Sequence, residues 1–343
     1  MKAAYARAGH IEVDVAGNPV PGPGQVLVRP LACGICGSDL HVLEMQATMP
    51  EQLPPIIPGH EFVGELIDYG SHCERRLPLG TVVTSVPYLD TAEGPQLVGL
   101  SPSAPGALAQ RMVLQESRLV AVPDGSVARE LIALAEPLAV GAHAVAAAGM
   151  RERDVALVVG CGPVGLAVIA ALRAAGHGPV VASDFSPRRR ELAERLGADV
   201  IVDPAETSPY TAWSELAGPA LPPSPLLGAG QHANTVIFEC VGVPGVLSTI
   251  CESALPHTRI VVVGVCMQPD TFTPAIANTK ELSFHYVFAY RTEEFATAVT
   301  WIAEGAIDIA PIVTAKLPLG DTARAFTQLR SPDGHGKILI TAE

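Results

Sequence analysis

The sequence of 343 residues has few basic side chains and no basic run long enough to bind a polyanion. Lysine and arginine together number 22 against 35 aspartates and glutamates, which gives a net charge of −13. This charge argues against nucleic acid or an anionic membrane surface as a partner. The one basic cluster, Arg188–Arg190, lies in a segment where a nucleotide is expected to bind.

The sequence also lacks the patterns of secreted and membrane proteins. Its first residues, MKAAYARAGHIEVD, contain no apolar core of a secretory signal. No run approaches the apolar length, about 18 residues, that spans a bilayer. Seven cysteines, an odd number, suit a reducing compartment better than a disulfide framework. Because hydrophobic residues make up 48% and charged residues 17%, we expect a globular, cytoplasmic protein with two domains.

The sequence does contain a nucleotide-binding pattern from Asp154 to Asp184. The apolar run Val155–Val159 predicts a buried parallel strand, and a G-x-G-x-x-G motif and an alanine-rich helix follow it. The glycines permit a tight turn, a close approach of backbone to a pyrophosphate, and close packing of helix on strand. The residues predicted to hold the cofactor here are Gly160, Gly162, Pro163, Val164 and Gly165.

Asp184 ends the second strand of this pattern. An acidic side chain there can accept hydrogen bonds from both ribose hydroxyls of NAD, and it repels the 2′-phosphate of NADP. Arg188–Arg190 could neutralise a phosphate, but they fan around the first turn of a helix and cannot all face one group. Arg189 is expected to cover the adenosine instead. The sequence therefore predicts NAD as the cofactor, with NADP less favoured.

The alternation of strands and helices predicts an α/β fold with a doubly wound parallel sheet after a β-rich first domain. Six strands of this sheet are predicted, at Val155–Val159, Pro179–Ser183, Val200–Val202, Thr235–Glu239, Arg259–Val265 and Leu282–Val287. The segment Pro219–Gly230 is rich in proline and glycine and predicts a surface loop.

Two polar stretches in the first domain offer metal ligands. They are CGICGSDLH, residues Cys33–His41, and PGHE, residues Pro58–Glu61. A C-x-x-C pair can be half of a zinc knuckle or a redox pair, but the chain has no second such pair. Together the stretches supply a thiolate, an imidazole and a carboxylate. This donor set suits Zn²⁺ with a fourth position open to water or substrate.

With these motifs the chain resembles the zinc-dependent medium-chain alcohol dehydrogenases over nearly its whole length. The segments in the family's order are GICGSDLH, PGHEFVG, EPLAVGAHA, VVGCGPVG, RIVVVGV, YRTEEF and GKILI. Their wording is most similar to that of sorbitol and threonine dehydrogenases. The resemblance implies a GroES-like catalytic domain of residues 1–145 and 288–343 and a Rossmann domain of residues 146–287.

The resemblance also implies a catalytic zinc site. Its expected ligands are Cys36, His60, Glu61 and Glu136. Of the two carboxylates, Glu61 is expected to bind directly or intermittently, and Glu136 to ligate the metal or hold its water. Which of them is the third ligand stays open. Cys33 is expected to be a buried apolar residue, because a second thiolate would use up the open position.

Further roles follow from the same resemblance. Ser38 would accept the substrate hydroxyl proton and pass it through the cofactor ribose towards His41. Lys337 would meet the pyrophosphate, and Val263 and Val265 would flank the nicotinamide.

One departure from the family concerns a second zinc. Many relatives carry four closely spaced cysteines for a structural zinc, but this chain has no cysteine between Thr84 and Glu116. A segment rich in proline, glycine and serine, Tyr88–Gly106, stands in their place. We therefore expect one catalytic zinc and no structural zinc.

The predicted function is oxidation of a small primary or secondary alcohol, or reduction of the matching carbonyl, by hydride exchange with NAD(H). Apolar pocket candidates, Leu43, Tyr88, Met267 and Phe288, favour an alcohol less polar than a sugar. The apolar segment Leu282–Ala289 at the sheet edge predicts a homodimer or homotetramer.

Two alternatives remain open. A zinc-free NAD(P)H-dependent reductase on the same scaffold would not need Cys36, His60 and Glu61 together. A non-catalytic cofactor-sensing protein would leave Ser38 and His41 without a role.

Overall fold

The computed structural model describes residues 1–49, 52–124, 128–218, 235–331 and 335–341. The chain forms two compact units, Met1–Glu136 with Phe295–Glu343, and Pro137–Glu294. The sequence predicts a catalytic domain of residues 1–145 and 288–343 and a nucleotide-binding domain of residues 146–287. These functional assignments stay predictions. The predicted loop Pro219–Gly230 lies outside the described residues.

The second unit is built on a six-stranded parallel sheet, which confirms the doubly wound fold. The strand order is β12–β11–β10–β13–β14–β15, and every neighbouring pair is parallel. The strands are β10 (Val155–Val159), β11 (Val180–Ser183), β12 (Val200–Val202), β13 (Thr235–Glu239), β14 (Arg259–Val262) and β15 (Ser283–Tyr286). Chain order reverses between β10 and β13, which is where sheets of this type bind ligands at the carboxyl ends of their strands.

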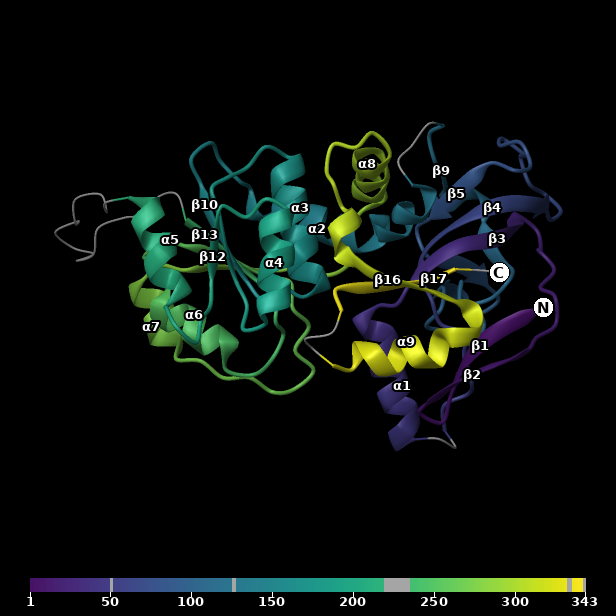
Figure 1. Ribbon diagram of the computed structural model, residues 1–343, viewed down its shortest axis with the longest axis horizontal. Coiled ribbons are helices and arrows are strands. Elements are labelled where there is room, and N and C mark those ends of the chain that lie inside the picture. The colour runs from purple at the N-terminus through teal and green to yellow at the C-terminus, as the bar shows by residue number, and fades with distance from the viewer. Residues whose placement is uncertain (50–51, 125–127, 219–234, 332–334, 342–343) are drawn as a thin grey trace. The chain divides into compact units, whose positions relative to one another are not determined.

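Helices cover both faces of this sheet (Figure 1). On one side lie α3 (Pro163–Ala174) and α4 (Pro187–Arg195), and on the other lie α5 (Pro209–Ala217), α6 (Val246–Ser253) and α7 (Pro274–Thr279). Four of these five helices have proline in their first turn, where its missing N–H costs nothing. The fully buried Trp213 of α5 fixes its helix to the sheet by donating to the Val155 carbonyl at 3.0 Å.

The first unit is built on a seven-stranded sheet in the order β16–β17–β3–β4–β5–β9, with β8 also paired to β3. The strands are β3 (Gln25–Gly34), β4 (Glu61–Tyr69), β5 (Val82–Ser85), β8 (Met112–Gln115), β9 (Leu119–Ala121), β16 (Val313–Pro318) and β17 (Lys337–Thr341). Gly34 at the end of β3 lies opposite Glu61 of β4 on one side and Leu339 of β17 on the other. The last strand of the chain therefore lies beside the two polar stretches near its beginning.

The other helices and strands of the described chain lie outside these two sheets. They are β1 (Lys2–Arg7), β2 (His10–Val15), α1 (Gly37–Thr48), β6 (Tyr88–Thr91), β7 (Gly94–Leu97), α2 (Ala135–Ala148), α8 (Thr292–Ala303) and α9 (Thr322–Leu329). Short 3-10 turns lie at Glu116–Arg118, Arg129–Leu134, Ala310–Ile312 and Leu319–Asp321.

One helical stretch, Arg129–Ala148, is long and apolar enough by length and composition to cross a membrane. The sequence analysis expected no such stretch. Its most apolar window has a mean hydropathy of 1.7, but 72% of that window is buried inside the structure. The apolar side chains of α2 thus belong to the packed interior.

Candidate metal centre and nucleotide crevice

Three ligand-type side chains meet at the ends of two paired strands in the first unit. Cys36 follows β3 and caps the start of α1, while His60 and Glu61 lead into β4. The chain turns sharply after β3 because the Asp39 carboxylate accepts the Cys36 N–H at 2.9 Å and so begins α1. The antiparallel pairing of β3 with β4 then brings Cys36 close to His60 and Glu61.

Among the described residues, one group of three or more potential ligands is compact enough to hold a metal ion. It consists of Cys36, His60 and Glu61, whose ligand atoms all lie within 4.8 Å of one another. Cys36 is half-buried, and the other two are 5% and 0% exposed. Glu61 Oε2 is buried and has no hydrogen-bond partner within the described part of the chain, a cost of about 1–3 kcal/mol unless another group satisfies it. The donor set and this unpartnered oxygen fit Zn²⁺.

Asp39 orients His60. Its buried carboxylate lies 3.5 Å from His60 Nδ1 and also accepts the Gly59 N–H at 3.3 Å. Burial disfavours the charged imidazolium, but the Asp39 carboxylate outweighs burial and holds the pKa of His60 well above its ordinary value. With Nδ1 facing Asp39, the other ring nitrogen, Nε2, faces Ser38, whose Oγ lies 3.3 Å away.

Lys337 lies at a different site from the one expected. Its ammonium is buried and donates to Glu61 Oε1 at 2.7 Å and to the Ile35 carbonyl at 3.1 Å. Burial lowers the pKa of Lys337, but the Glu61 carboxylate outweighs burial and the pKa lies above its ordinary value. A side chain that is 1% exposed and bound to Glu61 does not fit the expected role at the pyrophosphate. Its role here is to neutralise one of the candidate ligands.

The other residues expected around the metal are placed as follows. Glu136 is half-buried in the first turn of α2 and is not a member of the compact ligand group. Cys33 is buried, its thiol donates to the Gly34 carbonyl at 3.3 Å, and burial raises its pKa well above the ordinary value. His41 is exposed and lies 3.6 Å from Glu44. Ser38 thus lies at the ligand group, and His41 lies on the solvent side of α1.

The glycine loop of the second unit has the backbone that a pyrophosphate needs. Gly160 adopts φ +90°, which bends the chain sharply out of β10. Gly162 caps α3, and Pro163 begins it. A Cβ at Gly165 would collide with the Gly160 carbonyl, so only glycine lets helix and strand lie this close. Because the first N–H groups of a helix can bind an anion, the start of α3 is a candidate site for the pyrophosphate.

Asp184 lies at the end of β11 beside this loop. Its two carboxylate oxygens accept the N–H groups of Cys161 and Ser186, each at 2.8 Å. Arg189 lies 3.7 Å from the same carboxylate.

The neighbouring arginines have carboxylate partners of their own, although Arg190 also donates to the Asp184 carbonyl at 2.9 Å. Arg188 pairs with Glu191 at 2.6 Å, and Arg190 pairs with Asp203 at 2.8 Å. As predicted from the helix geometry, the three arginines do not converge on one point.

The sequence analysis missed the buried acid Glu239, which ends β13 in the segment FECVG. Glu239 is 2% exposed and accepts the N–H groups of Val241 and Gly242. Burial raises the pKa of its carboxyl, and the two N–H donors oppose that shift. Of the residues expected beside the nicotinamide, Val263 is buried and Val265 is 58% exposed. The signal that could have revealed Glu239 is an acidic residue at the carboxyl end of a buried strand.

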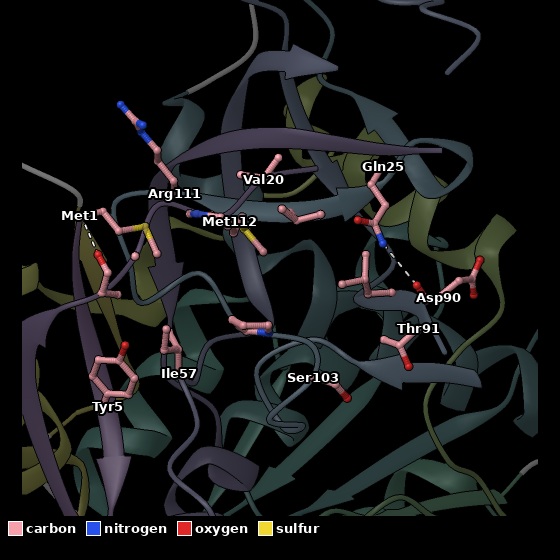
Figure 2. Close-up of a pocket in the computed structure, with 16 residues that line it drawn as sticks. Met1, Tyr5, Val20, Gln25, Ile57, Asp90, Thr91, Ser103, Arg111 and Met112 are labelled. Carbon is pink, nitrogen blue, oxygen red and sulfur yellow. Dashed lines mark hydrogen bonds between the residues drawn. The ribbon is translucent and has the colours of Figure 1, made fainter. Parts of the chain in front are cut away.

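The segment Tyr88–Gly106 folds through hydrogen bonds and a short hairpin, β6–β7. Ser101 Oγ donates to Gln96 at 3.0 Å, and Gln25 donates to the Asp90 carbonyl at 3.3 Å. A cavity of about 460 Å³ lies between this segment and the N-terminal residues (Figure 2). Its lining includes Asp90, Ser103 and Arg111 but none of the candidate metal ligands. The residues that line this cavity are thus different from those that could hold a metal.

Comparison with known proteins gives two matching family models. The alcohol dehydrogenase GroES-like domain matches residues 22–124, and the zinc-binding dehydrogenase matches residues 163–304. The (R,R)-butanediol dehydrogenase of Bacillus subtilis (strain 168) is 31% identical to this chain over 99% of both sequences. The sorbitol dehydrogenase of Ovis aries is 30% identical over 98% of this chain and 94% of its own length.

Solved structures agree with these matches. The crystal structure of 2R,3R-butanediol dehydrogenase from Bacillus subtilis has a TM-score of 0.84 and 29% identity, covering 100% of this chain and 99% of that one. A zinc-binding dehydrogenase from Sinorhizobium meliloti 1021, described as putative and bound to NADP, has a TM-score of 0.83 and 26% identity. It covers 99% of this chain and 98% of its own.

Proposed function

The chain belongs to the zinc-dependent medium-chain alcohol dehydrogenases, and on this premise we propose that it oxidises a small alcohol at Cys36, His60 and Glu61 with NAD as hydride acceptor. Membership makes it an oxidoreductase acting on CH–OH groups, and it confirms the resemblance to the polyol dehydrogenase branch. The observation that carries the proposal is the compact Cys–His–Glu group in a chain that also has a dinucleotide-binding glycine loop.

We assign the metal site to Cys36, His60 and Glu61. When bound there, zinc supplies a Lewis acid that lowers the pKa of a hydroxyl group. Asp39 holds the His60 ring, and Lys337 balances the charge of Glu61, so the ligands are oriented before a metal arrives. Glu136 lies outside the compact group, and we propose that it holds a water molecule near the metal site.

Ser38 is the first acceptor for the hydroxyl proton in this account. Its Oγ lies 3.3 Å from His60 Nε2, which places it beside the ligand group. His41 is 66% exposed at its side chain and can release a proton to solvent. A bound NAD would supply ribose hydroxyl groups near these two residues, as the family resemblance implies.

We further propose NAD rather than NADP. The Asp184 carboxylate ends β11, the position that holds the adenosine ribose in folds of this class. Of the three arginines that could neutralise a phosphate, Arg188 and Arg190 pair with Glu191 and Asp203, which supports this choice. The NADP in the Sinorhizobium meliloti relative belongs to that protein and makes cofactor choice a direct test for this one.

For the substrate, we propose a primary or secondary alcohol less polar than a sugar, such as a short diol. The name of the Bacillus subtilis relative, a butanediol dehydrogenase, supports this class. Met267 and Phe288 are 78% and 81% exposed and are free to contact an apolar group. Leu43, expected to line the pocket, is 2% exposed in the core and is withdrawn from that role.

The remaining assignments complete the proposal. We propose one zinc per subunit, because Thr84–Glu116 has no cysteine for a second site. We propose a homodimer or homotetramer joined through β15, and a cytoplasmic enzyme, because all seven cysteines are free thiols.

The test is NADH formation by purified protein with a panel of short diols, polyols, and aliphatic and aromatic alcohols, before and after a zinc chelator. We expect turnover of a short secondary alcohol or diol that stops on chelation and returns with zinc. Carbonyl reduction by metal-free protein would identify the zinc-free reductase instead. Tight NADH binding without turnover of any alcohol or carbonyl would indicate a cofactor sensor.

A further inference from the structure

The Glu239 side chain and main chain bind two different loops. Its carboxylate oxygen Oε1 accepts the N–H groups of Val241 and Gly242 at 2.7 and 2.8 Å, which closes the turn that follows β13. Its main-chain carbonyl accepts the N–H groups of Val263 and Gly264, both at 2.9 Å, in the loop that follows β14. One residue therefore fixes the exits of two neighbouring parallel strands.

The two loops cross at a pair of glycines. A Cβ at Gly264 would collide with the Gly242 backbone nitrogen and lie 2.8 Å from Glu239 Oε2. A Cβ at Gly242, which has φ +69°, would lie 2.7 Å from the Val265 nitrogen. The crossing has no room for a side chain, so a small displacement of one loop must displace the other.

Beside the crossing, the loops are open. A cavity of about 240 Å³ is lined by residues that include Glu239, Gly242, Leu247, Gly264, Val265 and Asp270. Val241 and Val265 are 42% and 58% exposed although they flank a tightly packed crossing. These exposed valines follow the carboxyl ends of β13 and β14, where a doubly wound sheet holds the half of a dinucleotide remote from the first glycine loop.

We propose that Glu239 is a positioning residue for the nicotinamide half of the cofactor, acting through the Val241–Gly242 and Val263–Val265 loops. The inference rests on the proposed NAD-dependent function. Glu239 does not touch the reacting atoms in this account. It fixes the backbone that carries the valine side chains, and the adenosine half depends instead on Gly160–Gly165 and Asp184.

The test compares two ligands that differ only in the nicotinamide ring, NADH and ADP-ribose, on the zinc-loaded full-length protein. Glu239→Ala should raise the Kd of NADH by at least about tenfold, because two hydrogen bonds to a charged acceptor are lost. The Kd of ADP-ribose should change by less than about twofold. In turnover, KM for NAD should rise more than kcat falls. Glu239→Gln, whose amide oxygen can accept the same two N–H groups, should recover most of the NADH affinity.

Asp154→Asn is the matched control. Asp154 is also a buried carboxylate of this unit, but it precedes β10 at the amino end, accepts the Arg151 N–H at 2.6 Å and pairs with Arg259. This variant should lower Tm and leave the Kd of NADH unchanged. If Glu239→Ala does not fold, Gly264→Ala replaces it, since the added methyl displaces the same crossing, and the same ligand pattern is expected.

Equal weakening of NADH and ADP-ribose, or no weakening of either, would overturn the proposal. So would a Glu239→Gln variant as weak as Glu239→Ala. A wild-type protein that fails to bind NADH would instead refute the proposed function, which keeps the two failures distinguishable.

Discussion

Two cysteine thiols three positions apart illustrate how strongly local surroundings decide reactivity. Cys33 is enclosed in the first unit, where burial raises its pKa, and its thiol donates to a carbonyl. Cys36 caps a helix at the half-buried end of β3, close to His60 and Glu61. A metal needs a thiolate, and a helix N-terminus stabilises negative charge. Of these two cysteines, we therefore assign only Cys36 as a metal ligand.

Cys36→Ala should remove the zinc and lower kcat/KM by more than about 100-fold, since even residues that only support a ligand are worth 10–100-fold. The fold should remain, because the Cys36 side chain is not part of the apolar core. Cys33→Ala is the control and should keep the zinc. The measurement is elemental analysis with circular dichroism on both variants. Zinc retained by Cys36→Ala, or lost from Cys33→Ala, would contradict the assignment.

Cofactor choice also depends on one carboxylate. NAD should exceed NADP by at least roughly tenfold in kcat/KM, which needs only about 1.4 kcal/mol of repulsion between Asp184 and a phosphate of about two charges. Asp184→Gly should narrow or invert this preference without changing zinc content. Asp199→Ala, which removes a carboxylate of the same unit paired with Arg173 at the start of β11, is the control and should leave the preference unchanged. Equal efficiency with both cofactors in the unmodified enzyme would mean that the arginines dominate.

For single residues, the sequence predicted which side chains form the candidate metal site, but it did not predict the distant side chains that contact them. Cys36, His60 and Glu61 could be chosen because their spacing and chemistry are local signals, and the structure brings them together. The surroundings of Lys337 could not be predicted, because they depend on the pairing of β17 with β3, two strands far apart in the sequence. Its buried ion pair with Glu61 follows from the order of the strands in the sheet. Removing one partner of such a pair typically costs about 3–5 kcal/mol, since the other charge is left buried.

Among the elements, β15 presents an unpaired side. In the part of the chain that the structure describes, it has one neighbour, β14, and it ends the sheet. Tyr286 and Phe288 at its end are 68% and 81% exposed. An edge with apolar side chains and free backbone groups invites pairing with a second copy.

We expect a homodimer or larger assembly at micromolar concentration by light scattering. The double variant Tyr286→Lys with Phe288→Lys should shift the protein towards monomer, because lysines on an edge strand block pairing. The double variant Val15→Lys with Val20→Lys, which adds the same two charges at positions 79% and 85% exposed in the other unit, should leave the mass unchanged. A wild-type monomer would contradict the prediction, as would an unaltered mass of the Tyr286→Lys with Phe288→Lys variant.

Whole strands could be predicted where the sequence has a clear apolar pattern. All six strands of the parallel sheet lie where the apolar runs predict them. The helix α1 was not predicted, because its sequence, GSDLHVLEMQAT, reads as a polar motif. It begins through a capping arrangement between Cys36 and Asp39, which depends on three-dimensional geometry as much as on residue type.

In the whole molecule, the two units carry different candidate sites. The candidate metal ligands and their supporting residues, Asp39 and Lys337, all belong to the unit of residues 1–136 and 295–343. The glycine loop, Asp184 and Glu239 belong to the unit of residues 137–294. A loss of metal should therefore abolish turnover while leaving binding of the adenosine half intact.

The central claim is that one zinc, held by Cys36, His60 and Glu61, makes this protein an NAD-dependent alcohol dehydrogenase. The most direct test removes metal with a chelator, returns zinc in steps, and measures NADH formation and zinc content on the same samples. We predict that activity rises in proportion to bound zinc and levels off at one zinc per subunit. Activity that survives complete metal removal, or that keeps rising to two zinc ions per subunit, would contradict the account.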